Sequence, residues 1–393
     1  MRIIVSSLTY PLPNGVTSSV NESVDGFLSA GHEVVIVSPD YDVGQARPEH
    51  RSVASSVVAR AVVQFFGKKE RMFGIRSSGE IREIIEEFQP DAYWLHTITW
   101  ASNAFERIML KSDKAKILTY HTMLDMYGRL YGGAVGEQRM IARSRDVANA
   151  VDRVITPSHY MEGKLRQFGV TTPIDVIATG INQPKRKISR GEFKRRWGIR
   201  SDHDILIYVG RVVKEKNIET LLKALKLVLR TRQNVTLVLV GPGDIDETIE
   251  QAKELGIESN LKCIGQLPMD EAKASYAAAD LFVFASQSET QGLVIGEAMI
   301  SDIPVVALYS PIQPEVYPTG TAFIANTVTE FAYQIVRALE NDELRHHITE
   351  TGKEYVLANF TKEIMLQKQL RTFELALKHQ QEATKPAMGE LVH

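Results

Sequence analysis

The chain has 393 residues and a formal net charge of -2, and 24% of its residues are charged. This length exceeds what a single hydrophobic core usually supports, so two domains are expected. The balanced charge gives no sign of nucleic-acid binding, and with Cys263 as the single cysteine no disulfide can form within the chain.

The N-terminus carries a short apolar run, MRIIVSSLTYPLP, that lacks the length and the cleavage site of a signal peptide. No stretch approaches the roughly 20 apolar residues that a transmembrane helix needs. We therefore expect a cytoplasmic protein, with attachment to the inner face of the cell membrane as the alternative. The apolar neighbours of Cys263 predict a buried strand residue rather than a reactive thiol.

Short runs rich in Val and Ile alternate with longer amphipathic segments, which is typical of βαβ units and parallel sheets. In the first half, a strand is expected at residues 2–5, a Gly-containing loop at 11–16, a helix at 17–30 and a strand at 33–37. Further strands are predicted at residues 92–95, 116–120, 153–156 and 175–177.

Residues 183–201 are basic and poor in large apolar side chains, so the domain junction is expected just before them, near Gly180. The second half restarts the pattern, with strands predicted at 205–209, 235–240, 261–264, 281–284 and 304–307 and a helix at 218–229. The predicted units are an N-terminal domain of residues 1–182, a C-terminal domain of 183–360, a helix over 361–380 that returns to the N-terminal domain, and a mobile tail, 381–393. The predicted fold class is α/β, with two Rossmann-like domains facing across a cleft, and ligands are expected beyond the carboxyl ends of the strands.

The segment SQSETQGLVIGEAMISDIP, residues 286–304, follows a predicted strand and opens a helix. A helix that begins near Gly292 would turn free N–H groups toward an anion such as phosphate. Glu289 and Glu297 flank that helix end, and carboxylates accept hydrogen bonds from sugar hydroxyls. A bare glutamate pair at this spacing is more often one loop charge and one helix charge, but the strand, Gly loop and helix around it favour a site.

A second cluster, GRVVKEKN at residues 210–217, also follows a strand and opens a helix. Arg211 offers a planar fork to a phosphate, and Lys216 offers a point charge. Together they could neutralise a departing diphosphate. The alternative interpretation is a solvated basic loop.

These segments resemble those of retaining glycosyltransferases of the GT-B fold, glycosyltransferase family 4 in particular. GRVVKEKN is similar to that family's GR-x4-KG segment, SETQGLVIGEAM to its E-x7-E motif and VGPGD to its Gly-rich segment, while ADLFVFAS and VIATGIN resemble further family segments. The resemblance extends from residue 1 to about residue 376. Asn217 departs from it where the family usually has Gly, and Ser301-Asp302 departs where a small residue and Gly are common.

The resemblance implies a role for each matched residue. Arg211 and Lys216 would hold the diphosphate, Glu289 and His121 would contact the donor sugar, and Glu297 would bind the ribose. The remaining donor-binding residues implied are Gly15, Gly210, Gln266, Leu267, Gly292, Leu293 and Val294, and the acceptor-side residues are Asn14, Asp125 and Tyr127. For Asn14-Gly15 a plain turn, and for His121 and His96 a structural role, are the alternatives.

No metal site and no cofactor are expected. His96 and His121 lack a recognised ligand spacing, and the Asp-x-Asp pattern within residues 243–247 is interpreted as the capped start of a helix. In GT-B enzymes the helix dipole and basic residues replace a metal, so the nucleotide diphosphate sugar is the one co-substrate implied.

The segments NGVTSSV, TYHTMLDMY and SETQGLV resemble those of the branch that glycosylates diacylglycerol. The predicted function is therefore the retaining transfer of a hexose from a UDP-sugar to a lipid hydroxyl. Residues 57–76 or the basic stretch 185–200 could contact a membrane surface; a packed helix and a linker are the respective alternatives. Competing functions are transfer to a soluble molecule or glycan, an epimerase or inverting enzyme of the same architecture, and a non-catalytic protein that binds sugar nucleotides.

Overall fold

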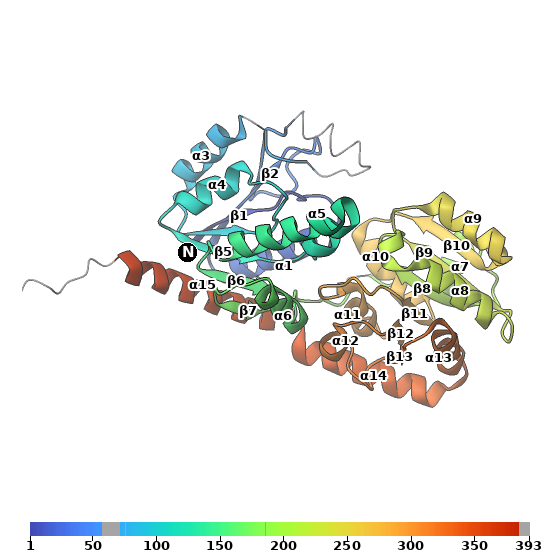
Figure 1. Ribbon diagram of the computed structural model, residues 1–393. Coiled ribbons are helices and arrows are strands. Elements are labelled where there is room, and N and C mark those ends of the chain that lie inside the picture. The colour runs from blue at the N-terminus through green and yellow to red at the C-terminus, as the bar shows by residue number, and fades with distance from the viewer. Residues whose placement is uncertain (57–70, 75, 185, 385–393) are drawn as a thin grey trace, which may run out of the picture. The chain divides into compact units, whose positions relative to one another are not determined.

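The computed structural model describes residues 1–56, 71–74, 76–184 and 186–384. The chain forms two compact units, one of Met1–Gly180 with Lys362–His393 and the other of Ile181–Thr361. Figure 1 shows the chain coloured from blue to red, and its red C-terminal helix α15 (Lys362–Thr384) belongs to the same unit as the blue N-terminal strands. The C-terminal helix therefore completes the domain with which the chain begins.

The first unit is built on a parallel sheet whose strand order, over the described residues, is β3-β2-β1-β4-β5-β6-β7. Its strands are β1 (Arg2–Ser6), β2 (Glu33–Pro39), β3 (His50–Val53), β4 (Ala92–Leu95), β5 (Ala115–Thr119), β6 (Arg153–Thr156) and β7 (Ile174–Val176). Its helices are α1 (Gly15–Ser29), α3 (Ser77–Phe88), α4 (Ala104–Lys111), α5 (Leu124–Ala148), α6 (His159–Gln167) and α15. The strand order reverses between β1 and β4, which is where open parallel sheets bind ligands.

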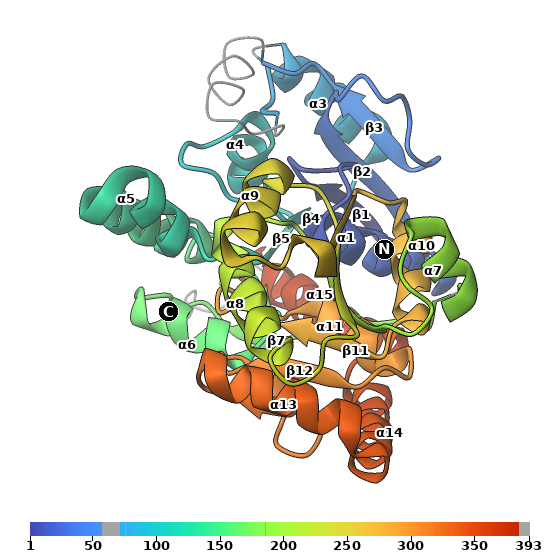
Figure 2. The same cartoon turned by 90° about the vertical axis from the view of Figure 1, so that its right-hand side faces the viewer.

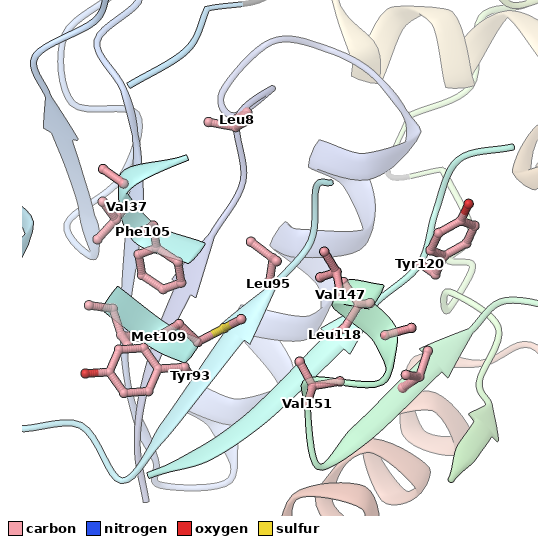
Figure 3. Packing of buried hydrophobic residues seen from close by; sticks show 14 of the residues in the cluster. Leu8, Val37, Tyr93, Leu95, Phe105, Met109, Leu118, Tyr120, Val147 and Val151 are labelled. Atoms are coloured by element: carbon pink, nitrogen blue, oxygen red, sulfur yellow. The ribbon is translucent and has the colours of Figure 1, made fainter. Parts of the chain in front are cut away.

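Successive residues of the central strands enter two different cores, because side chains alternate between the faces of a strand. Ile3 and Val5 pack in one cluster with Phe27 of α1 and Phe373 of α15, whereas Ile4 belongs to the other cluster. Figure 3 shows that second cluster, with side chains from strands β4 and β5 and helices α4 and α5. The sheet is thus covered by apolar side chains on both faces, as a parallel sheet requires.

The second unit repeats the same order, β10-β9-β8-β11-β12-β13, in its described part. Its strands are β8 (Asp204–Val209), β9 (Val235–Val240), β10 (Leu261–Gly265), β11 (Leu281–Phe284), β12 (Val305–Leu308) and β13 (Phe323–Ala325). Its helices are α7 (Arg190–Trp197), α8 (Ile218–Val228), α9 (Ile245–Leu255), α10 (Met269–Ser275), α11 (Leu293–Ile300), α12 (Gln313–Val316), α13 (Val328–Glu340) and α14 (Asp342–Asn359), with 3-10 turns η1 (Lys214–Lys216), η2 (Glu258–Asn260) and η3 (Tyr276–Ala278). Helix α8 contacts α9 and α13, and α11 contacts α14 (Figure 2). Here the order reverses between β8 and β11.

Most predicted strands agree with these bounds, but two strands were not predicted. The edge strand β3 reads HRSV and β13 has only three residues, so neither gives the apolar run that marks a covered strand. Helix α1 starts two residues before the predicted start because the Asn14 side chain accepts a hydrogen bond from the Thr17 N–H and caps it.

The segment after the domain junction contains a helix, and one correction concerns the C-terminus. The basic stretch after residue 183 contains helix α7, which Ser189 caps by accepting a hydrogen bond from the Glu192 N–H. Helix α15 continues through Thr384, so the first residues of the predicted tail are helical, and the rest of that tail lies outside the described residues. No helix among the described residues is long and apolar enough to cross a membrane.

Candidate active site

Direct backbone contact holds the turn after β8 against the turn after β9. The Val212 N–H donates to the Pro242 carbonyl at 2.8 Å, and the Gly241 N–H donates to the Gly265 carbonyl at 2.8 Å. A Cβ at Gly241 would lie 1.9 Å from the carbonyl oxygen of Gly210, and its φ of 147° also disfavours other residues. The Gly-rich segment is therefore needed for loop packing, whatever it binds.

The 3-10 turn η1 follows β8 and lies beside both predicted phosphate-binding cations. Arg211, whose side chain is 50% exposed, pairs with Glu215 at 3.1 Å. Lys216 ends the turn, and Asn217 follows it with φ of 57°. The Asn217 amide donates to the Ala285 carbonyl, directly after β11, at 3.2 Å. The segments that follow the neighbouring strands β8 and β11 are therefore in direct contact.

An ion pair joins these two segments. Lys216 Nζ lies 2.6 Å from Glu289 Oε1, and both side chains are largely buried, 17% and 15% exposed. Beside them the Ser288 hydroxyl donates to the Glu215 carbonyl at 2.9 Å. The structure thus brings together Lys216 and Glu289, which the sequence predicted for one site.

Helix α11 begins at this point. Gly292 adopts the left-handed conformation, with φ of 69°, immediately before the helix. A Cβ at Gly292 would lie 3.2 Å from Ile312 Cδ1 and 3.3 Å from Ile295 Cδ1. Leu293 and Val294 open the helix, so their N–H groups have no partner within it and give this end a partial positive charge.

Glu297 lies one turn further along α11 in a largely enclosed position. Its carboxylate pairs with Lys273 Nζ at 3.0 Å and accepts a hydrogen bond from the Tyr276 hydroxyl at 3.4 Å. Burial and the charge of Glu297 raise the pKa of Tyr276, so the phenol stays protonated and donates. Gln266 and Leu267 lie between β10 and α10, the helix that carries Lys273. Neither Lys273 nor Tyr276 was predicted, because no local pattern links α10 to α11.

Two further buried phenols lie close to the Lys216–Glu289 pair. Burial, with a smaller effect of the Glu289 charge, raises the pKa of Tyr208, whose hydroxyl donates to the Arg211 carbonyl at 2.9 Å. Burial raises the pKa of Tyr317 to about 12, and Glu289 contributes to that shift. Glu289 therefore pairs with Lys216 and has two neutral phenols nearby, whose hydroxyls donate to backbone carbonyls.

Several predicted site residues lie in the first unit. His121 follows β5, and its Nε2 lies 2.9 Å from Nδ1 of His96, which follows β4. Asn14, predicted on the acceptor side, caps α1, and Gly15 is the first residue of that helix. The cap requires the Asn14 side chain for helix stability, independently of any ligand.

Asp125 and Tyr127, the other predicted acceptor-side residues, lie in the first turn of α5. Asp125 is buried and forms an ion pair with Lys164 of α6, while its Oδ1 has no partner among the described residues. The Tyr127 ring stacks on that of Tyr131, with centroids 6.4 Å apart. Lys164 was missed because it lies 39 positions away in the sequence.

The structure also tests the predictions for Cys263 and for the Asp-x-Asp segment. Cys263 lies in strand β10 and is only partly buried, and burial raises its pKa to about 11, so the thiol is neutral at neutral pH. The Asp-x-Asp segment opens a helix as predicted, since α9 begins at Ile245, but the predicted cap is wrong because Asp244 makes no side-chain capping bond. No cluster of three or more His, Cys, Asp or Glu side chains that could hold a metal ion occurs in the described residues.

Of the two segments predicted to contact a membrane, the structure describes little of the first and nearly all of the second. Residues 57–70 and 75 lie outside the described residues. Within the stretch 185–200, Arg190 pairs with Asp280, and Arg196 pairs with Glu271, all inside the second unit. Much of that basic charge is therefore already matched by carboxylates of the same domain.

Comparison with known proteins identifies the relatives of both halves. Residues 13–183 match the family model described as Glycosyltransferase Family 4, and residues 189–355 match Glycosyl transferases group 1. The chain is 31% identical over 324 residues to an alpha-monoglucosyldiacylglycerol synthase of Streptococcus pneumoniae, covering 79% of this chain and 72% of the relative. It is 26% identical over 325 residues to a GDP-mannose-dependent alpha-mannosyltransferase of Mycolicibacterium smegmatis, covering 78% and 79%. The solved structure of Anabaena HepE in complex with UDP and glucose is similar in fold, with a TM-score of 0.77, 18% identity and coverage of 95% and 99%.

Proposed function

Because this chain belongs to the family 4 glycosyltransferases of the GT-B fold and is close to diacylglycerol glucosyltransferases, we propose that it transfers a hexose to an acceptor hydroxyl with retention of configuration. The donor would be a nucleotide diphosphate sugar. The observation that carries the proposal is the 2.6 Å pair of Lys216 and Glu289 beside the start of α11. A cation and a helix end meet there at the point where strand order reverses.

In the proposed reaction the bond between the anomeric carbon and the diphosphate breaks first. Negative charge grows on the departing oxygen, and Lys216, Arg211 and the N–H groups of Leu293 and Val294 stabilise it. The acceptor hydroxyl then attacks the oxocarbenium-like carbon on the face that the diphosphate leaves, and its proton passes to a phosphate oxygen. The configuration is retained without a nucleophile supplied by the protein.

The carboxylates would bind the two substituents of the diphosphate. Glu289, held by Lys216, accepts hydrogen bonds from hydroxyls of the donor sugar, and Glu297, held by Lys273 and Tyr276, accepts them from the ribose. Ionised carboxylates have only acceptor oxygens, which suits polyhydroxylated ligands. We propose that no metal ion or cofactor takes part, since the cations and the helix end supply the positive charge.

For the substrates, we propose a UDP-hexose and diacylglycerol. The pneumococcal relative is named an alpha-monoglucosyldiacylglycerol synthase, which supports the lipid, and the HepE structure is a complex with UDP and glucose, which supports the donor. The mycobacterial relative is named for GDP-mannose, which makes that donor the principal competitor. A lipid acceptor implies work at the membrane surface, for which residues 57–76 or, alternatively, 185–200 are the proposed contact.

The test is a transfer assay with the purified chain, a panel of UDP-, GDP- and ADP-hexoses, and vesicles that contain diacylglycerol. The expected product is an α-hexosyl lipid from an α-linked donor, identified by mass and by NMR of the anomeric proton. A β product would contradict retention. Transfer to water-soluble alcohols or glycans at a higher rate than to the lipid would favour the soluble-acceptor function.

A function of another class is the binding of sugar nucleotides without catalysis. The assay separates the two, because a binding protein returns the donor unchanged after prolonged incubation with every acceptor. Thermal-shift measurements with the same donors report binding in either case.

A further inference from the structure

Two histidine rings from neighbouring strands are hydrogen-bonded to each other in the first unit. His96 follows β4 and His121 follows β5, with only Tyr120 between His121 and its strand. The rings are stacked, with centroids 5.2 Å apart and an interplanar angle of 18°, and His96 Nδ1 lies 2.9 Å from His121 Nε2. The Trp94 ring also packs against the His96 ring, with centroids 4.5 Å apart. The His96 ring therefore has little freedom to turn.

Both rings are neutral near pH 7. Burial lowers the pKa of His121 to about 4, and burial together with the neighbouring His121 lowers the pKa of His96 well below its ordinary value. A neutral imidazole has one N–H and one bare nitrogen. The contact between the rings therefore needs a hydrogen on one of the two facing nitrogens and a lone pair on the other, which leaves two arrangements.

The far nitrogen of His96 distinguishes these arrangements. His96 Nε2 is buried and has no hydrogen-bond partner among the described residues. If His121 Nε2–H were the donor, His96 would be protonated on Nε2, and a buried N–H would meet no acceptor. If His96 Nδ1–H is the donor, Nε2 keeps only a lone pair. Buried donors without a partner are rarer in proteins than unpaired acceptors, so the second arrangement is favoured.

We propose that His96 is a positioning residue that holds His121 as its Nδ1–H tautomer, so that His121 offers an N–H donor to an oxygen of the donor sugar. The choice of ligand rests on the proposed function, whereas the tautomer follows from the contacts of two neutral rings. His121 is only partly buried, and its Nδ1 has no protein partner within the part of the chain that the structure describes. Neutral imidazole in water favours the Nε2–H form, so the contact with His96 selects the less common donor geometry.

His50 provides an internal reference with the opposite tautomer. Its Nδ1 accepts a hydrogen bond from the Ala46 N–H at 3.2 Å, so its hydrogen is on Nε2, which lies 2.8 Å from the Ser38 hydroxyl. His50 is buried like His96, and burial also lowers its pKa. The same spectrum should therefore contain both kinds of neutral histidine.

The experiment is a long-range proton–nitrogen NMR correlation of the full chain labelled with 15N-histidine at pH 7.5, with the signals of His121 and His50 assigned through His121→Gln and His50→Gln variants. We expect His121 to show a protonated, pyrrole-type Nδ1 and a bare, pyridine-type Nε2, and His50 to show the reverse. A pyrrole-type Nε2 at His121, or a doubly protonated His121 ring, overturns the assignment. This measurement needs no variant of His96 that might fail to fold and no transfer activity.

Kinetics test the positioning role. His96→Leu removes the donor, so His121 should shift toward the Nε2–H form, and kcat/KM for the donor should fall about tenfold, the effect of losing one oriented hydrogen bond. His96→Asn keeps an N–H near the position of Nδ1 and should restore both the tautomer and the rate to within about threefold. A shifted tautomer with an unchanged rate contradicts the role of His96. The expected spectrum without transfer to any acceptor would contradict the proposed function and support the tautomer.

Discussion

Lys216 Nζ lies 2.6 Å from Glu289 Oε1, although 73 residues separate the two in the sequence. Strands β8 and β11 are neighbours, and the segments after their carboxyl ends meet at the reversal point of the sheet. The pair is largely buried, so removal of either member leaves the other charge without its partner.

Lys216→Ala should reduce transfer by about 100- to 1000-fold, as expected when a group that stabilises charge in the transition state is lost. The effect should appear mainly in kcat, measured at saturating donor. Lys214→Ala is the matched control, because Lys214 is an exposed lysine of the same turn η1, and it should transfer at nearly the wild-type rate. If Lys216→Ala transferred as fast as the Lys214→Ala control and the wild type, Lys216 would have no role in the proposed mechanism.

Gly292→Ala should destabilise the second unit by about 1–2 kcal/mol, because Gly292 has a positive φ and a Cβ would press on Ile295 and Ile312. Gly163→Ala in helix α6 should change the free energy of unfolding in the opposite direction. A Cβ added at Gly163 would meet no atom within 4 Å, so alanine should stabilise the helix by up to about 1 kcal/mol. Denaturant unfolding of both variants measures the difference. A Gly292→Ala protein as stable as the wild type would contradict the assigned backbone conformation.

Glu297→Gln should raise KM for the donor about tenfold and change kcat less than threefold, because contacts to the ribose act equally in ground and transition states. Glu271→Gln serves as control, since Glu271 of helix α10 pairs with Arg196 instead. Initial rates over a range of donor concentrations separate the two parameters. A fall in kcat with unchanged KM would assign Glu297 to the chemical step.

The stability of the chain should decrease as the pH falls from 6.5 to about 4. The pKa of His121 is about 4 in the folded chain and near 6.5 when unfolded, so in this window the unfolded state binds the additional proton. This shift corresponds to roughly 3.4 kcal/mol at most. His121→Gln should flatten the dependence of the unfolding midpoint on pH, whereas His346→Gln, at an exposed position of α14, should leave it unchanged. If the unfolding midpoints of the wild type and both variants changed with pH in parallel, the lowered pKa of His121 would be contradicted.

Transfer should continue at full rate in excess EDTA. Arg211, Lys216 and the start of α11 would supply the positive charge that a divalent ion provides in metal-dependent transferases. The assay compares the chain with and without chelator, followed by added Mg²⁺ or Mn²⁺. Loss of activity on chelation, reversed by one of these ions, would show that the proposed mechanism is incomplete.

Two departures from the family pattern are explained by the backbone. Asn217 and Asp302 stand where the resemblance to the family predicts Gly, and both have positive φ, 57° and 62°. Asn and Asp tolerate this conformation better than other residues with side chains. Asn217 also bonds to Ala285, and Asp302 pairs with Lys353 at 2.6 Å, so each side chain adds a contact that Gly cannot make.

The alternation of apolar runs and amphipathic segments was sufficient to predict two parallel-sheet domains, because strand and helix formation depend largely on local pattern. The same local pattern predicted that the Glu289 and Lys216 segments follow strands. It could not predict the partners Lys273, Lys164 and His96, which reach their sites from other elements of the fold. Strand order and helix packing decide which distant side chains meet, and the ion pairs, the tautomer of His121 and the left-handed turns are consequences of that packing.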